Sequence, residues 1–224
     1  MKSRMIAIAA ALIATPLYAQ EITAAGPAAR PADNAFEITL GGGYAQGFGD
    51  IGAGQRSLTD DSSAGGEVQL GLGWRINPNF MVGLYGSGSL HSTGDFTPGA
   101  NIYTATAGAQ ANYHFLPAND WDPWIGLGAG WRGLWITQNG TESRHGLDLA
   151  RVTAGVDYRV NSQFAVSPYV GLGLTTFLTQ ELVGQQKFGN VQSPDVNVWV
   201  SAGIQGRFDL FGSNGPSMRL ASAN

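Results

Sequence analysis

The 224-residue chain carries a formal net charge of −4, and only 12% of its residues are charged, whereas 33 are glycine. An acidic chain without a basic patch cannot neutralise phosphates, which excludes a nucleic acid as the expected partner. The chain contains no cysteine, so packing and backbone pairing must hold the fold without disulfides. The low proportion of charged residues and the many glycines also disfavour a water-soluble protein whose surface is covered by Lys and Glu.

The first residues have the pattern of a secretory signal peptide. Residues 1–4 include the basic Lys2 and Arg4, residues 5–14 are apolar, and Ala19 is a small residue suited to cleavage. The apolar run is shorter than the ~20 residues that a transmembrane helix needs. We therefore predict a signal peptide over residues 1–19, whose removal with Lys2 and Arg4 takes the charge from −4 to −6. A flexible lead-in rich in Ala and Pro follows over residues 20–35.

From Phe36 onward, eight segments alternate apolar and polar residues, as β-strands with one apolar and one polar face do. The clearest runs from Tyr103 to Phe115, where every odd-numbered residue is apolar and the even-numbered residues are polar or glycine. It is long enough to cross a tilted apolar band of ~25 Å. The predicted strands are residues 36–45, 66–75, 80–90, 103–115, 124–136, 147–160, 164–178 and 196–211.

The predicted connections alternate in length. Residues 77–79, 117–123 and 161–163 form short turns, and residues 46–65, 91–101, 137–146 and 179–195 form longer polar loops. Membrane barrels of the outer-membrane type have short periplasmic turns and longer external loops. The predicted fold is therefore all-β: an eight-stranded antiparallel transmembrane β-barrel over residues 36–211. Eight strands leave a lumen only just wide enough for side chains.

Aromatic residues lie beside the predicted short turns, at the level where amphipathic rings favour lipid headgroups. The predicted periplasmic girdle comprises Phe36, Trp74, Phe80, Tyr113, Phe115, Trp124, Tyr158, Phe164 and Phe208. Candidates for a thinner external girdle are Tyr44, Tyr103, Trp131 and Trp135. The soluble alternative is a lipocalin-like barrel with an apolar cavity and a polar exterior. Loop asymmetry, the girdle and charges on the polar face favour the membrane barrel.

Charged residues on the polar face are predicted to form a network in the lumen. The layer near the short turns holds Glu37, Arg75, His114, Asp157, Arg159, Arg207 and Asp209, and an upper layer holds Glu67, Arg132 and Arg151. Unpaired charge in a narrow, partly dry lumen is costly, so opposite charges should pair. The favoured interpretation is a plug of side chains. The alternatives are a gated polar pathway, or attraction of an anion by Arg132 and Arg151.

Two predicted loops contain residue types that occur in hydrolase active sites. One holds His91, Ser92 and Asp95, and the other holds Glu142, Ser143 and His145. Nothing in the sequence orders a nucleophile, a base and an orienting group. The adjacent Asp60 and Asp61 lack the further spaced oxygen ligands of a calcium site. We predict no catalytic residue, cofactor or metal.

The strand count, the loop asymmetry and the signal peptide together resemble the small outer-membrane β-barrel proteins of Gram-negative bacteria. This group includes the OmpA transmembrane domain, OmpX and the opacity proteins. The segment from Gly203 to Phe211 is similar to the C-terminal signal that the family presents to the barrel-assembly machinery. The tail over residues 212–224 departs from that pattern and is too short for a peptidoglycan-binding domain.

The resemblance implies an outer-membrane location among lipid and lipopolysaccharide, with a possible extracellular ligand at the loops. A closed barrel has no edge that demands a partner, so we expect a monomer. The expected role is structural or surface-interacting and not enzymatic. A narrow porin-like channel for small solutes is the first alternative. A lipid A-modifying enzyme on the same scaffold is the second, although its catalytic residues are not matched here.

Overall fold

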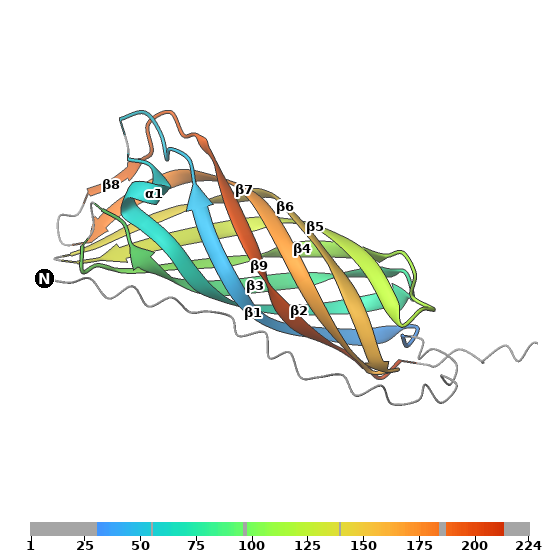
Figure 1. Ribbon diagram of the computed structural model, residues 1–224. Helices are drawn as coiled ribbons and strands as arrows, with labels where there is room; N and C mark the ends of the chain where they lie inside the picture. The colour runs from blue at the N-terminus through green and yellow to red at the C-terminus, as the bar shows by residue number, and fades with distance from the viewer. Residues whose placement is uncertain (1–30, 55, 96–97, 139, 184–186, 213–224) are drawn as a thin grey trace, which may run out of the picture.

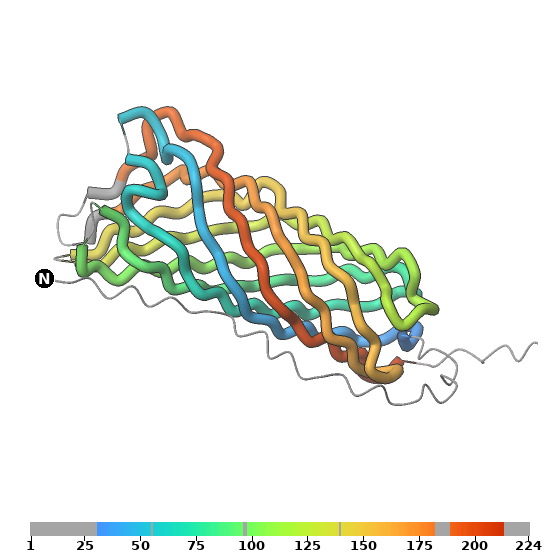
Figure 2. Tube along the Cα trace, viewed as in Figure 1, coloured from blue at the N-terminus to red at the C-terminus, as the bar shows by residue number. Residues whose placement is uncertain are grey.

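The computed structural model describes residues 31–54, 56–95, 98–138, 140–183 and 187–212. The predicted signal peptide, the lead-in up to residue 30 and the tail from residue 213 lie outside the described residues. The part that is described forms one sheet wrapped into a tall barrel (Figures 1 and 2).

The barrel consists of eight long antiparallel strands and one short additional strand. The long strands are β1 (Ala35–Phe48), β2 (Ser62–Asn77), β3 (Phe80–Thr93), β4 (Asn101–His114), β5 (Trp121–Thr137), β6 (Thr141–Asn161), β7 (Phe164–Val183) and β9 (Val196–Leu210). The short strand β8 (Lys187–Asn190) pairs with the far end of β7, and the helix α1 (Leu58–Asp61) lies between β1 and β2. No helix in the described ranges is long and apolar enough to span a membrane.

Backbone pairing closes the sheet. Strands β1 to β7 each pair with the next along the chain, and β9 pairs with both β7 and β1. The closing seam runs from Phe36 opposite Leu210 to Phe48 opposite Val198. Closure satisfies the backbone groups that an open edge would expose. The predicted eight-stranded antiparallel barrel is confirmed, with β8 as an extra strand inside the predicted loop 179–195.

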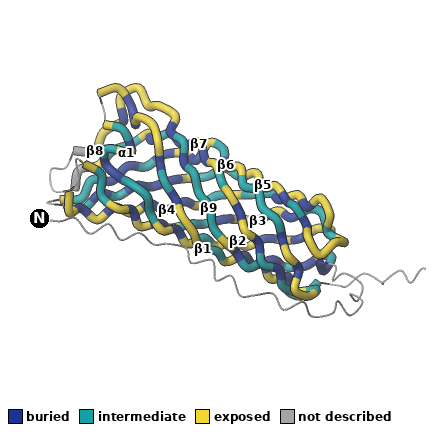
Figure 3. Tube along the Cα trace, viewed as in Figure 1, coloured by how far each residue is buried: buried dark blue, intermediate teal, exposed yellow. Residues whose placement is uncertain are grey.

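The side chains that face outward are apolar, and those that face the lumen are mostly polar. Leu40, Val68, Leu84, Leu127 and Ile204 are each more than half exposed. Buried and exposed positions alternate along the strands, as Figure 3 shows. Apolar surface of this extent, with charge inside, suits a barrel surrounded by lipid. The soluble, lipocalin-like alternative is therefore wrong.

The strands are longer than predicted at the end that carries the longer connections. The predicted loop 137–146 is wrong, because β5 continues to Thr137 and β6 begins at Thr141, which leaves a three-residue turn. The predicted turn 117–123 is also too long, since β5 begins at Trp121 and includes Pro123. Beyond the lipid-facing band no apolar outer face is needed, so the alternation that marks the strands fades there.

An apolar cluster closes the external mouth of the barrel. Ile51, Leu58 and Val191 come from the connections, and they pack with inward side chains at the ends of the strands. The cluster, called here the external cap, comprises Ile51, Leu58, Ala100, Ile102, Leu134, Ile136, Phe177, Val191 and Trp199. Helix α1 and strand β8 lie at this same end (Figure 1). At this end of the barrel the inward-facing residues are therefore apolar, as in the hydrophobic core of a small soluble protein.

Candidate functional site in the barrel lumen

All ten charged residues predicted to share the lumen lie inside the barrel. Each has at most 9% of its surface exposed. They come from six strands of the wall: Glu37 (β1), Glu67 and Arg75 (β2), His114 (β4), Arg132 (β5), Arg151, Asp157 and Arg159 (β6), and Arg207 and Asp209 (β9). Period-two alternation brings them inward, because successive side chains on a strand point to opposite faces.

Arg75 is one centre of a network near the short turns. Its guanidinium pairs with Glu37, and its Nε lies 3.2 Å from Asp209 Oδ1. The other oxygen of Asp209 accepts a hydrogen bond of 2.9 Å from Arg159 Nη1. One carboxylate thus joins two guanidinium groups from different strands, which ties β2 and β6 to β9 across the lumen.

Arg207 is the second centre of this network. It pairs with Glu37, and its Nε lies 2.9 Å from Asp157 Oδ2. Its guanidinium carbon lies 5.0 Å from the centre of the Trp124 ring. A guanidinium over an indole face gains cation–π attraction when it is removed from water. Arg207 is completely buried, so these partners take the place of part of its hydration shell.

His114 completes the network at its edge. Its Nδ1 lies 2.7 Å from Asp122 Oδ2 and 3.8 Å from Asp157 Oδ2. Asp122 also accepts a 2.9 Å hydrogen bond from the backbone N–H of Leu116. The eight residues together, called here the periplasmic network, are Glu37, Arg75, His114, Asp122, Asp157, Arg159, Arg207 and Asp209.

Three members of the periplasmic network have the spacing of metal ligands. One ligand atom from each of His114, Asp122 and Asp157 lies within 4.8 Å of the other two. Arg207 already pairs with Asp157, and its positive charge opposes a second cation. A ligating histidine also normally donates its other N–H to a partner, but His114 Nε2 has none among the described residues. We therefore assign these residues to ion pairing.

Five residues of the periplasmic network are completely buried. Arg75, His114, Asp157 and Arg207 have no accessible surface, and Asp122 has none. Water therefore cannot reach these side chains, either from bulk solvent or from an internal cavity. At this level these five side chains are packed against protein groups and are not exposed to solvent.

A second charged group lies higher in the lumen. Arg132 Nε donates to Thr175 Oγ1 at 3.0 Å, and its Nη2 lies 3.5 Å from Asp148 Oδ1. Asp148 also accepts a 3.0 Å hydrogen bond from the Tyr85 hydroxyl. Arg132 lies over the Trp199 ring at 4.4 Å. This guanidinium is thus held by protein groups on several sides.

Arg151 and Glu67 belong to the same level. Arg151 Nη2 donates to Gln69 Oε1 at 2.8 Å, and the guanidinium lies 4.8 Å from the Tyr85 ring centre. Glu67 accepts a 3.2 Å hydrogen bond from Ser87 Oγ. Two cavities of ≈ 20 Å³ each adjoin these groups. Such a cavity holds about one water molecule, so this level is polar but narrow.

Several lumen residues escaped the sequence prediction. Asp122 fell in a predicted turn, and Tyr85 was not assigned to the lumen. Asp148 was missed because of a β-bulge: on β5 Gly128 and Gly130 are two residues apart, but their partners Arg151 and Asp148 are three apart. The extra residue reverses the alternation. A simple count places Asp148 outside, and only a prediction of the bulge could have found it.

Trp124 was predicted in the lipid-facing girdle, and that prediction is wrong. The residue is only 4% exposed, and its indole N–H donates to Ser167 Oγ at 2.8 Å inside the barrel. Alternation along β5 carries the signal, because Ile125 and Leu127 face lipid and Trp124 must then face the lumen. Trp199 is likewise buried.

The structure does not bring the two sets of candidate hydrolase residues from the loops into catalytic arrangements. His91 is buried and its Nε2 lies 2.7 Å from Ser89 Oγ, whereas Ser92 points to the other face and Asp95 is exposed in the loop. Glu142 pairs with Arg144 at 2.6 Å. His145 packs against Trp131 on the outer surface. Neither set forms a nucleophile–base pair among the described residues.

Comparison with known proteins gives a family match and several similar structures. The model of the outer membrane protein beta-barrel domain matches residues 7–201. Neisserial surface protein A has a crystal structure with 14% sequence identity and a TM-score of 0.54, over 78% of this chain and 97% of that one. OprG from Pseudomonas aeruginosa has 15% identity and a TM-score of 0.49, over 79% and 98%. No curated protein matches the sequence.

Proposed function

The chain belongs to the outer membrane protein β-barrel family, and from this premise we propose that it is a non-enzymatic barrel with a structural or surface-interaction role. Its lumen is closed by its own side chains. The family and the fold place the protein in the outer membrane of a Gram-negative bacterium. The proposal concerns what the barrel does there.

The observation that carries the proposal is the dry periplasmic network. Its three arginines face four carboxylates, and His114 lies 2.7 Å from one of them. Buried charges are tolerated when they pair with good geometry and are costly when a partner is missing. The arginines and carboxylates of the network pair with one another inside the barrel, whereas a permeation pathway needs water around its charges.

The external cap supports the same proposal at the other end. Its nine residues are at most 7% exposed and come from the connections as well as from the strands. An apolar cluster of this kind excludes ions because it offers them no replacement for their hydration. A solute would therefore meet two barriers, one apolar at the external mouth and one ionic near the periplasm.

The external surface supports a role in interaction. Strands β5 to β7 continue toward the outside, and the connections over residues 49–61 and 191–195 pack on the mouth. A bridge between Gly52 and Pro194 joins the first and last of these connections, and a bridge between Asp50 and Ser57 lies within the first. A surface supported in this way is a fixed platform for a partner, as functional loops on a rigid scaffold often are.

Conductance of a planar lipid bilayer tests whether the lumen is closed. We expect the wild-type barrel to insert without steady single-channel steps. The double variant Glu37→Ala, Arg207→Ala removes an ion pair and its volume, and it should produce such steps. Leu84→Ala, on the lipid-facing surface, is the control and should stay silent.

Heat-dependent gel mobility must first establish that each variant is folded. Steady steps from the wild-type protein that change in size with Arg132→Ala or Arg151→Ala would overturn the proposal. They would favour the narrow channel, since these residues line the cavity of the upper lumen.

A further inference from the structure

An aromatic cluster lies on the outer surface of β5 and β6 near the external end. The rings of Trp131 and His145 stack at 5.6 Å with 19° between their planes. Trp135 meets His145 edge-on at 5.5 Å and lies 5.9 Å from Trp131. Gly133 lies between the two tryptophans, and a Cβ there would collide with both indoles. We call Trp131, Trp135 and His145 the aromatic platform.

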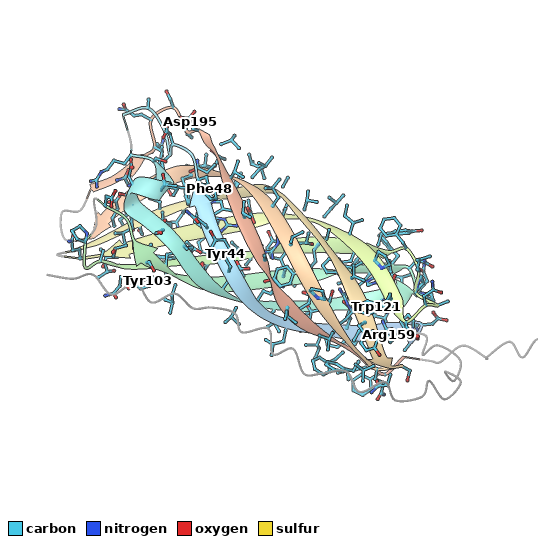
Figure 4. All side chains as sticks on the ribbon, viewed as in Figure 1. Tyr44, Phe48, Tyr103, Trp121, Arg159 and Asp195 are labelled. Atoms are coloured by element: carbon cyan, nitrogen blue, oxygen red, sulfur yellow. The ribbon has the colours of Figure 1, made fainter. Side chains whose placement is uncertain are left out.

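The height of the platform follows from strand geometry. Trp121 and Trp131 both face outward on β5, ten residues apart. At a rise of ~3.3 Å per residue and a tilt of ~40°, they are separated by about 25 Å along the barrel axis, the height of the apolar band. Trp121 lies at the end with the short turns, opposite the end that carries Asp195 (Figure 4).

The platform therefore extends from the outer boundary of the apolar band into the headgroup layer. Trp131 lies at that boundary, and Trp135 lies about 10 Å farther out by the same geometry. Outward residues between the two boundaries, such as Ile125 and Leu127, are apolar and exposed. The lipid component that meets the platform is thus a headgroup of the external leaflet.

The polar atoms of the platform are free to donate hydrogen bonds. The two indole nitrogens are donors only, and a protonated imidazole is a donor at both nitrogens. None of these nitrogens has a hydrogen bond to a described residue, although all three rings lie close together. The stacked contact with Trp131 holds the His145 imidazole beside the two indoles. Such a set of donors complements a partner rich in acceptors and negative charge.

The opposite boundary provides a natural comparison on the same two strands. Trp121 and Tyr158 contact each other with ring centres 4.9 Å apart. This pair contains no imidazole, and its phenol is uncharged. It has the composition of an ordinary interfacial anchor, whereas the platform adds an imidazole as a further hydrogen-bond donor.

We propose that the aromatic platform binds the phosphorylated sugar headgroup of a lipid in the external leaflet. His145 and the indole N–H groups donate to the phosphate, and the exposed indole faces pack against the sugar ring. The inference deepens the surface role proposed above and rests on it for the nature of the partner. It does not depend on whether the lumen conducts.

Native mass spectrometry of the purified full chain in detergent tests the proposal. The probes are lipid A with its phosphates, the same lipid A with the phosphates removed, and phosphatidylglycerol. We expect the wild-type protein to retain one molecule of phosphorylated lipid A. Removing the phosphates or changing His145→Ala should each weaken retention by about tenfold or more, the effect of losing one hydrogen bond to a charged group.

Trp121→Leu is the matched control, because it removes an outward tryptophan at the other boundary. It should leave retention of lipid A unchanged, and heat-dependent mobility should confirm that all variants are folded. Equal retention by His145→Ala and wild type would overturn the proposal. If Trp121→Leu lost as much retention of lipid A as His145→Ala, the platform would be an ordinary interfacial anchor and the proposal would be overturned. Equally strong retention of phosphatidylglycerol would overturn recognition of the sugar. Conductance of the same samples reports separately on the closed lumen.

Discussion

Single residues of the periplasmic network hold more than one partner each. Arg207 pairs with Glu37 from β1 and with Asp157 from β6, and its face covers Trp124 from β5. Because every partner comes from a different strand, one side chain joins distant parts of the wall. Such a network stabilises the fold only when every charge has a partner, because a buried charge without one is more destabilising than an apolar side chain in the same place.

Arg207→Ala tests this dependence. The change leaves Glu37 with only Arg75 and deprives Asp157 of its nearest guanidinium, 2.9 Å away. We expect the free energy of unfolding to fall by about 3–5 kcal/mol, as for other buried pairs that lose one partner. Denaturant unfolding from lipid vesicles measures it.

Arg56→Ala is the control for this experiment. Arg56 also pairs with an aspartate, Asp61, but its side chain is 54% exposed. Exposed pairs contribute less than about 1 kcal/mol, since solvent screens them. Equal losses from the two changes would show that burial does not set the value of these pairs, contrary to the argument from the network.

At the level of elements, the seam between β1 and β9 is the joint that closes the barrel. Gly43 and Gly203 face each other across it. A Cβ on Gly43 would collide with the backbone carbonyl of Ala202 and lie 2.6 Å from the Cα of Gly203. Backbone atoms cannot rotate away as a side chain can, so glycine is required for this close approach.

Gly43→Ala should therefore loosen the seam. We expect the free energy of unfolding to fall by about 1–3 kcal/mol, the usual effect of overpacking. Gly66→Ala is the matched control on β2, because a Cβ there meets nothing within 4 Å; its effect should be close to zero. If both changes were neutral in vesicle unfolding, the close approach at the seam would not limit the structure.

The same scale explains what the sequence could predict. The alternation from Tyr103 to Phe115 is enforced by lipid on one side and a polar lumen on the other, so the middle of each strand was predicted correctly. Where the lipid ends, nothing enforces the pattern, and the continuation of β5 to Thr137 was missed. The bulge beside Asp148 reversed the alternation locally, and the predicted turn 117–123 included Pro123, which lies within β5.

For the whole molecule, the membrane determines which face each residue needs. Within the apolar band the outward-facing side chains are apolar and the lumen contains charged residues. At the external mouth, by contrast, the inward-facing side chains of the external cap are apolar. The charged lumen and the lipid-facing wall therefore make separate demands on neighbouring residues. Val152 and Thr153 illustrate this, since they are adjacent on β6 but face opposite sides.

Arginine substitution at these two positions tests the facing of the whole barrel. Val152 is 37% exposed on the lipid side, and it lies six residues from Tyr158, close to the middle of the band. Val152→Arg should lower the free energy of unfolding by about 2–4 kcal/mol in vesicles, because the charge lies near the bilayer midplane. Thr153 lines a lumen cavity of ≈ 20 Å³, so Thr153→Arg should disturb packing or permeation instead.

Bilayer thickness separates the two effects. The cost of a charge on the lipid face falls toward the interfaces, and a shorter lipid brings the interface closer to residue 152. We therefore expect the loss from Val152→Arg to shrink in vesicles of shorter-chain lipid, whereas the loss from Thr153→Arg should stay constant because its surroundings are protein. An identical dependence on lipid length for both variants would contradict the facing of β6 and, with it, the assignment of the lumen residues.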